Sequence, residues 1–572
     1  MIEFKWNFFD KTARQWALLI SYTCVIFFIN IGGTGIYSAQ EGRAAIVARN
    51  MLKTGNYLNV EIAGEPETEK PIMTYWFYAV SGKVFGVNEF SVRLPSVISA
   101  IITVILTCWL GSRIYGAGTG LLAGYMLATM LSFVNLGRIA RIDIVLCAFY
   151  TLSMLLLYLG YFEKRKPDWR LYLFYIVLGL SVLVKGPVSA VLAGLTVLFL
   201  VVKERNWRII WELKPVSGLF IGLLINMPWY VYENVRTKGE FAWDFLWNQN
   251  IDRFLGINTT YCEGKRKTFF YYFPKLFAGA LPWSFLTPFC LYSFRGKFMS
   301  LRPATWFLLS WTLTVFFFFS LSAINRGDYI LPLYPALAIL LGRYLILVSE
   351  RRPKLSRYWK ICWFSLLGIT IITAGLLRTG VLCQIGQFSI DQKIAHFPDR
   401  DGMSIIQTSD LLNQHFIITI TVAALLLGLL YLLGKLCEQG KILPATNILL
   451  TVLLILFVWY YLWLDPVTSE FKTTKPFCQT ALTHLPENAV VGYYGSWVDE
   501  AVFYIGRDYV RCSKIPDFYD VEKQSFKFKF IIAPEHRIMQ LPDNIKSRME
   551  QLEKTVEGHQ YPLTLYRTKD QQ

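Results

Sequence analysis

The chain has 572 residues, of which 54% are hydrophobic and 17% are charged. Soluble domains carry about a quarter charged residues, so this composition excludes a lone soluble enzyme and a disordered protein and predicts a polytopic membrane protein. Lys and Arg outnumber Asp and Glu by 57 to 40, and the resulting net charge of +17 is typical of basic cytoplasmic loops. We predict no nucleic-acid partner, because no basic patch is interleaved with groove-reading or base-stacking structure.

Apolar runs recur along residues 1–464, which we predict to form one transmembrane domain. A helix needs about 20 mostly apolar residues to cross a bilayer, and the chain offers about thirteen such runs, so the predicted fold is an all-α polytopic membrane protein. The fifth and sixth runs meet at Lys185-Gly186-Pro187, where we expect a tight helical hairpin. The runs lie near residues 16–36, 93–113, 118–137, 142–162, 170–186, 187–203, 215–234, 274–294, 303–322, 328–349, 358–378, 415–436 and 442–464.

Lys and Arg residues predict the orientation of these spans. With the N-terminus in the cytoplasm, the loops on that side are short and basic, as in Lys164-Arg165-Lys166 and Arg351-Arg352. This is the arrangement that the positive-inside rule requires, and an odd number of spans then leaves the C-terminus outside. The first outer loop, residues 37–92, is long, and its segments Arg43–Leu58 and Ile72–Phe85 are predicted to form short interfacial helices.

The composition changes near Asp465, where polar residues return. We predict a small extracytoplasmic α/β domain over residues 465–572. Cys478 and Cys512 both fall in it, and an outer location is compatible with a disulfide between them. Strands are predicted at Ala489–Gly495, Tyr509–Cys512 and Phe526–Ala533, and helices at Glu500–Ile505 and Ile545–Thr555.

The ionisable residues at membrane depth all fall on the outer side in this topology. Such residues are costly and are candidates for function. Taken singly, each has an ordinary explanation as a surface ion pair, a helix cap or a headgroup anchor, but their shared side favours a common site. They are Glu41, Arg43, Glu69, Lys70, Asp143, Lys185, Arg253, Arg326, Asp328 and Tyr329.

A site that combines cations and carboxylates at the outer surface suits one kind of chemistry. ATP and nucleotide sugars are absent outside the cytoplasm, so an activated group must arrive attached to a lipid such as a polyprenyl phosphate. Cleavage of a sugar–phosphate bond leaves negative charge on the phosphate, which Lys and Arg stabilise. A carboxylate close to the acceptor can serve as its general base.

Several short motifs, in order along residues 10–345, together resemble a known family. The family is the GT-C glycosyltransferases that use lipid-linked sugars, within the protein O-mannosyltransferase superfamily, and the nearest branch is the bacterial aminoarabinose (lipid A) transferases. The motifs include Gln40-Glu41-Gly42-Arg43, Glu69-Lys70-Pro71, Arg141-Ile142-Asp143, Lys185-Gly186-Pro187, Asp252-Arg253-Phe254 and Asp328-Tyr329-Ile330.

The resemblance implies an inverting transfer of a sugar from undecaprenyl phosphate to a lipid, glycan or protein acceptor. It places the protein among the lipids of the bacterial inner membrane. Lys70, Arg253 and Tyr329 would hold the donor phosphate. Arg43, Glu69 and Lys185 would support substrate binding, whereas Glu41 and Asp143 would be the catalytic acids that face the acceptor.

Two departures from the family pattern bear on the acceptor and on metals. Gln40 stands where the family often has an Asp, so either Glu41 takes over its role or the acceptor is already an anion and needs no base. Residues Tyr261–Thr268 contain no His, whereas the aminoarabinose enzymes carry a His there that is implicated in a metal site. We therefore predict that no cofactor is required; a divalent metal is compatible with the family but is not predicted.

Two other functions are weighed against the transferase. A transporter or flippase of a lipid-linked saccharide would place polar groups near the bilayer midplane, commonly between internal repeats, and the sequence shows neither. An anchored binding module would need far fewer spans than about thirteen. The transferase therefore remains the principal prediction, and the flippase is the alternative.

Overall fold

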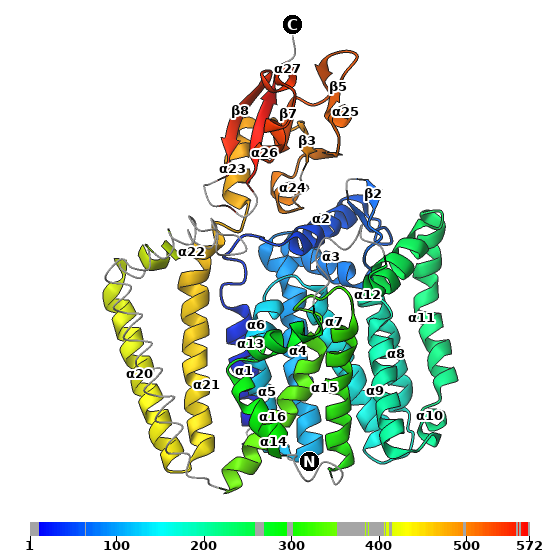
Figure 1. Cartoon of the computed structure of the whole chain (residues 1–572), viewed down its shortest axis with the longest axis vertical. Coiled ribbons are helices and arrows are strands. Elements are labelled where there is room, and N and C mark those ends of the chain that lie inside the picture. The colour runs from blue at the N-terminus through cyan, green and yellow to red at the C-terminus, as the bar shows by residue number, and fades with distance from the viewer. Residues whose placement is uncertain are drawn as a thin grey trace, which may run out of the picture.

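The computed structural model describes residues 11–62, 64–257, 268–293, 301–351, 414–495, 499–555 and 562–569, with residues 384, 387, 405, 406, 408–410 and 559. A bundle of helices forms the larger part, and a region of helices and strands near the C-terminus lies beyond one end of it (Figure 1). Two short helices of the first loop, α2 (Ala39–Thr54) and α3 (Met73–Phe85), lie between the bundle and that region.

Among the described residues, seven helices are long and apolar enough to cross a membrane, or up to nine if each of two bent helix pairs counts as one span. This agrees with a polytopic membrane protein. The predicted span at 358–378 lies outside the described residues, and the count of thirteen stays a prediction. The main helices of these seven spans, some of which continue into short flanking helices, are α4 (Glu89–Tyr115), α7 (Ile142–Leu157), α11 (Pro215–Arg236), α15 (Pro303–Leu321), α16 (Tyr334–Arg351), α20 (Phe416–Glu438) and α21 (Ile442–Trp459).

Two runs that were expected to be single spans are bent. α5 (Ala117–Ala128) and α6 (Leu131–Gly137) meet at 65°, with Met130 in extended backbone between them. The segments Phe269–Gly279 and Trp283–Ser293 meet at 112° across Pro282, which lacks the N–H that a continuous helix needs.

The predicted hairpin is present. α8 (Arg170–Lys185) and α9 (Val188–Glu204) are joined by Gly186 and Pro187 only. Gly186 has a φ of +97°, and a Cβ there would lie 2.7 Å from the Phe245 ring, so the turn requires glycine.

The remaining elements of the bundle are shorter. They are α1 (Lys11–Phe28), η1 (Tyr158–Phe162), α10 (Arg208–Glu212), η2 (Ala242–Asp252), α12 (Arg253–Leu255), η4 (Phe269–Tyr271), α13 (Tyr272–Gly279), η5 (Trp283–Leu286), α14 (Thr287–Ser293), η7 (Leu331–Leu333), η8 (Tyr460–Leu464) and α22 (Asp465–Ser469), with the small hairpin β1 (Glu61–Ile62) and β2 (Glu65–Pro66) in the first loop.

α7 is the most enclosed of the spans. In α7 with η1, 83% of the apolar window is buried, compared with 17% in α11. A helix that is apolar on all sides belongs in the interior of a bundle, and α7 matches this rule with a run of Ile, Val, Leu, Phe and Met. Asp143, in the first turn of α7, is therefore buried inside the bundle.

The region Lys475–Thr568 contains a five-stranded sheet in the order β4-β3-β7-β9-β8. Strands β3, β4 and β7 are parallel, and β9 runs antiparallel to β7 and β8. Its elements are α23 (Lys475–His484), β3 (Val490–Tyr494), α24 (Asp499–Ile505), β4 (Asp508–Cys512), α25 (Ile515–Phe518), β5 (Tyr519–Asp520), β6 (Ser525–Phe526), β7 (Phe530–Ala533), α26 (Glu535–Met539), α27 (Asp543–Lys546), β8 (Met549–Lys554) and β9 (Thr564–Thr568).

Two expectations for this region were wrong. The segment Ile545–Thr555 was expected to be a helix, but Met549–Lys554 forms the edge strand β8, because pairing with β9 overrides the helical preference of its Glu, Gln and Lys residues. Cys478 and Cys512 are free thiols, and they lie in separate apolar clusters.

Close contacts hold this region on the first loop. α24 packs against α2, and a Cβ on Gly42 would lie 2.6 Å from the backbone of Asp499. Arg49 Nη1 donates to the carbonyl of Phe503 at 3.0 Å, and Tyr504 Oη accepts from the Ile36 N–H at 2.6 Å. The two α-helices therefore approach each other at a distance that only glycine permits.

Candidate active site

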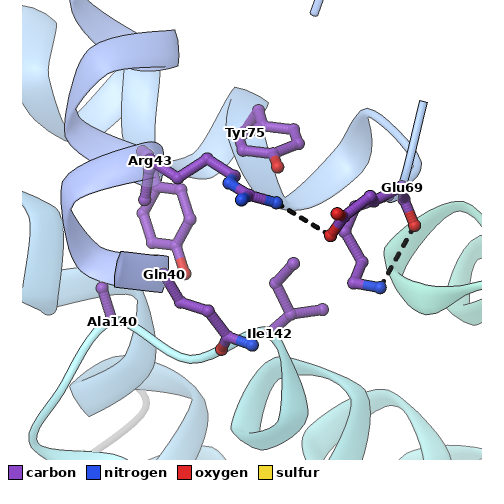
Figure 2. Close-up of a pocket in the computed structure, with 9 residues that line it drawn as sticks. Gln40, Arg43, Glu69, Tyr75, Ala140 and Ile142 are labelled. Carbon is purple, nitrogen blue, oxygen red and sulfur yellow. Dashed lines mark hydrogen bonds and ion pairs between the residues drawn. The ribbon is translucent and has the colours of Figure 1, made fainter. Parts of the chain in front are cut away.

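A cavity lies where α2, the loop before α3 and the start of α7 meet. Figure 2 shows Gln40 and Arg43 of α2 facing Glu69 across it, with Tyr75 of α3 and with Ala140 and Ile142 beside α7. The other lining residues are Ala44, Lys70 and Tyr78. The volume open to water is about 30 Å³, which holds about two water molecules. Two separate parts of the first loop and the segment that begins α7 thus line one cavity, and of the predicted site residues Arg43, Glu69 and Lys70 lie in its lining.

Arg43 connects three parts of the chain. Its Nη1 lies 2.8 Å from Glu69 Oε2 and 3.3 Å from Glu67 Oε2, and its Nε lies 3.8 Å from Asp499 Oδ2 of α24. Burial alone would raise the pKa of Glu69, but the Arg43 and Lys70 charges outweigh it and lower that pKa below the usual value. Glu69 therefore stays an anion at neutral pH and keeps Arg43 directed into the cavity.

Lys70 is the cation of the loop that faces the cavity. Its Nζ donates to the carbonyl of Glu69 at 3.1 Å. Burial lowers the pKa of Lys70 to about 8, and the positive charges of Arg253 and Lys185 contribute in the same direction. Three cations near enough to repel one another define a site that attracts an anion.

A second group of charges surrounds the start of α7. Asp143 is buried and forms an ion pair with Lys185, whose Nζ lies 4.5 Å from the centre of the Tyr329 ring. Arg141 Nη1 donates to Gln40 Oε1 at 2.8 Å and lies 3.7 Å from Asp328 Oδ2. Of the predicted residues, Lys185 therefore contacts both Asp143 and Tyr329, and Arg141, which pairs with the nearby Asp328, reaches the cavity through Gln40.

Three guanidinium groups around this site have unused donors. The Nε atoms of Arg43, Arg141 and Arg253 are buried and have no hydrogen-bond partner among the described residues, and Arg43 Nε has only the long ion pair with Asp499. The Nη1 of Arg253, in contrast, donates to Gln249 Oε1 at 2.7 Å. Buried polar atoms are almost always paired, so three unpaired donors in one region indicate room for an acceptor group that the chain itself does not supply.

Glu41 lies outside the cavity, whose lining includes its neighbour Gln40. The Glu41 carboxylate is fully buried, and its Oε1 accepts from Arg93 Nε at 2.8 Å and from the Ala140 N–H at 3.1 Å. Arg93 also donates to the carbonyls of Ile31, Thr34 and Gly35. Glu41 and Arg93 thus hold the start of the first loop against the segment before α7.

Arg93, Arg141 and Asp499 were not singled out by the sequence as site residues. The signal for Arg93 and Arg141 was a charge at the edge of a predicted span, which is costly without a partner. Asp499 gave no local signal, because it reaches Arg43 only through the docking of α24 on α2.

The carboxylates near the cavity are paired with arginine. Within the described part of the chain, no group of three or more His, Cys, Asp or Glu residues could hold a metal ion. Glu69, which lines the cavity, and Glu67 beside it both form ion pairs with the Arg43 guanidinium.

Relatives of known sequence and structure share this arrangement of helices. Residues 69–232 match the family described as dolichyl-phosphate-mannose-protein mannosyltransferase. The crystal structure of ArnT from Cupriavidus metallidurans bound to undecaprenyl phosphate superposes with a TM-score of 0.74 over 97% of this chain and 98% of that one, at 18% sequence identity. The fold is therefore that of a GT-C membrane protein.

Sequence similarity extends to two further relatives. An uncharacterized protein of Aquifex aeolicus (strain VF5) is 30% identical over 344 residues, which is 60% of this chain and 66% of that protein. The undecaprenyl phosphate-alpha-4-amino-4-deoxy-L-arabinose arabinosyl transferase of Enterobacter sp. (strain 638) is 28% identical over 337 residues, 58% of this chain and 60% of that one. The chain thus matches less than two thirds of either relative. These matches confirm the resemblance inferred from the motifs: the chain is similar to the protein O-mannosyltransferase superfamily and, within it, to the ArnT-like branch.

Proposed function

We propose that the protein is a membrane glycosyltransferase that takes a sugar from a polyprenyl phosphate. The observation that carries the proposal is the set of buried Nε donors without a hydrogen bond on Arg43, Arg141 and Arg253, in the region of Lys70. A phosphodiester supplies the acceptor oxygens that these donors lack, and its charge offsets the repulsion among the cations. The relatives named above as transferases support this reading, and none supports a flippase.

The reaction breaks the bond between the sugar's anomeric carbon and a phosphate oxygen. The acceptor nucleophile forms the new bond from the opposite face of the sugar, and the bonding electron pair leaves with the phosphate. Lys70, Arg253 and Tyr329 would bind that phosphate and stabilise its extra negative charge, whereas Lys185 and Arg43 add to the local positive field. Water is partly excluded from the site, which strengthens each of these interactions.

The proposed acceptor-side acids are Glu41 and Asp143. Both are engaged, Glu41 with Arg93 and Asp143 with Lys185, and the cavity presents Gln40 instead of an acid. An acceptor that is already an anion needs no proton removed, so this geometry favours an anionic acceptor over a neutral hydroxyl.

We place the site on the outer face of the bacterial inner membrane, with the N-terminus in the cytoplasm. We divide the chain into a transmembrane domain, 1–464, and an extracytoplasmic domain, 465–572. The basic inner loops support this orientation. We propose that no metal takes part, because Lys and Arg supply the positive charge, and treatment with EDTA should leave the rate of transfer unchanged.

The test is a transfer assay with the purified full-length chain in proteoliposomes. Undecaprenyl phosphate carrying a radiolabelled sugar is supplied together with bacterial envelope lipids, glycans and proteins as acceptors. A labelled covalent product and release of undecaprenyl phosphate support the transferase, and Lys70→Ala should lose both while the exposed Lys53→Ala keeps them. Movement of label across the bilayer without any product would instead support the flippase.

A further inference from the structure

A second cavity lies in the C-terminal region, at the carboxyl ends of β3 and β4. Its volume open to water is about 160 Å³, several times that of the first cavity. Its lining includes Tyr493 and Tyr494 of β3, Gly495 directly after β3, Arg511 of β4, Ser513 directly after β4, and Arg537 of α26.

The sheet topology places this cavity where α/β proteins bind ligands. Strands β4, β3 and β7 are parallel neighbours, so their carboxyl ends meet at one edge of the sheet. In open parallel sheets, ligands bind in the crevice outside that edge, because the loops there are free to vary while the strands hold them in place. The cavity is thus a built feature of the fold.

The charge of this cavity comes from two arginines on different elements. Arg511 belongs to β4 and Arg537 to α26, and Arg537 makes no ion pair within the described part of the chain. The carboxylate nearest to Arg537 along α26, Glu535, pairs with Lys554 instead. On the β4 side, Asp517 accepts from the backbone N–H groups of Ser513 and Lys514 at 2.7 Å each, which occupies that carboxylate.

Gly495 reserves the space in which Arg537 lies. Its φ is +74°, a conformation that favours glycine, and a Cβ there would come within 2.8 Å of Arg537 Cγ. The stem of Arg537 therefore packs directly on the backbone at the end of β3. This contact fixes the direction of a guanidinium whose charge the described chain leaves unmatched.

We propose that this cavity binds an oxyanion, of which the phosphate group of a phosphorylated saccharide is the best fit. A guanidinium presents paired donors that match phosphate oxygens, and the Tyr and Ser hydroxyls suit the polar remainder of a sugar. Gly495 precedes Asp499 by four residues, so the Cα atom of this lining residue lies within about 14 Å of the Cα atom of Asp499, which contacts Arg43. The inference goes beyond the transfer reaction and does not depend on it.

The test is a binding titration on the purified full-length chain in detergent, without any donor lipid. The probes are N-acetylglucosamine 1-phosphate, inorganic phosphate and N-acetylglucosamine, followed by calorimetry. We expect saturable binding of the phosphorylated sugar, competition by inorganic phosphate and no binding of the uncharged sugar. Arg537→Gln should weaken binding at least tenfold, whereas the exposed Lys546→Gln, which removes the same charge from the same region, should leave it unchanged.

The same titration with Lys70→Ala separates this cavity from the membrane site. Binding that survives Lys70→Ala supports the proposal, even if transfer activity is never observed. Equal affinities for phosphate and for the phosphorylated sugar assign recognition to the phosphate alone, and tighter binding of the sugar phosphate extends the site to the saccharide. The proposal is overturned if the wild type shows no saturable binding, if Arg537→Gln binds as tightly as the wild type, or if Lys70→Ala alone abolishes binding.

Discussion

Glu41 and Arg93 form an ion pair that is almost completely removed from solvent, with Arg93 Nε 2.8 Å from Glu41 Oε1. The pair links the start of α2 to the first turn of α4, and the remaining Arg93 donors are used on backbone carbonyls. Gln40, the residue before Glu41, lines the cavity. The geometry thus gives Glu41 a structural role that can be separated from catalysis.

Removing either charge should destabilise the fold. We expect Glu41→Gln and Arg93→Met to lower the free energy of unfolding by about 3–5 kcal/mol each, because each leaves an uncompensated buried charge. The double variant Glu41→Leu/Arg93→Leu should recover part of the loss. As a control, Arg113→Ala breaks a half-exposed pair with Glu163 and should change stability by less than about 1 kcal/mol.

Denaturant unfolding in detergent measures the stability of the Glu41 and Arg93 variants and of the Arg113→Ala control. Full stability of Glu41→Gln together with complete loss of transfer would contradict the structural role and support Glu41 as the catalytic acid.

The pKa of Lys70 predicts an alkaline limit to activity. Because burial and the neighbouring cations lower this pKa to about 8, Lys70 loses its charge as the pH rises through about 8. The rate of transfer should fall over that range, and Lys70→Arg, which stays charged, should extend activity to higher pH. A pH profile of the initial rate tests this, with Lys53→Arg as the control; an alkaline limit that is identical in the wild type and Lys70→Arg would assign it to another group.

Glu500 of α24 should make stability depend on pH. Burial raises the pKa of Glu500 to about 7, and the charges of Asp499 and Glu41 add to the effect. The folded chain then holds this proton more tightly than the unfolded chain, so its contribution to stability is full below about pH 4.5 and is lost as the pH rises through about 7. Glu500→Gln should raise stability at pH 8 by at most about 3 kcal/mol and leave it nearly unchanged at pH 4.5.

Thermal unfolding of Glu500→Gln at the two pH values, beside the exposed Glu487→Gln, measures this difference. A gain of the same size at both pH values would show that ionisation of Glu500 is not the cause.

Gly42 should be required for the docking of α24. A Cβ at this position would lie 2.6 Å from the backbone of Asp499, which cannot move as a flexible side chain can. Gly42→Ala should therefore cost about 1–3 kcal/mol and expose the C-terminal region to proteolysis. Gly194→Ala, on a helix with open space around it, should be neutral or slightly stabilising. Equal protease resistance of both variants would show that the close approach is not needed.

The sequence predicted the parts of the site that local rules govern. Glu69, Lys70, Asp143 and Lys185 stand out because a charge beside an apolar run needs a partner or a function. The start of α2 was placed four residues late, although Ser38 accepts from the Glu41 N–H and caps the helix.

Other features depend on contacts between distant segments. The partner of Glu41 is Arg93, and the partner of Arg43 in the C-terminal region is Asp499; neither pairing has any local signal. The strand β8 was missed for the same reason, because its Glu and Lys residues favour a helix until β9 is beside them.

We propose that cations from distant segments form one site for the phosphate of a polyprenyl lipid. The most direct measurement is titration of undecaprenyl phosphate into the purified full-length chain, followed by intrinsic tryptophan fluorescence, with wild type, Lys70→Ala and Lys53→Ala compared. We predict saturable binding that Lys70→Ala weakens at least about tenfold, since a hydrogen bond to a charged group contributes about 1.5–3 kcal/mol, and that Lys53→Ala leaves unchanged. Equal affinity of Lys70→Ala and the wild type would contradict a phosphate site that includes Lys70.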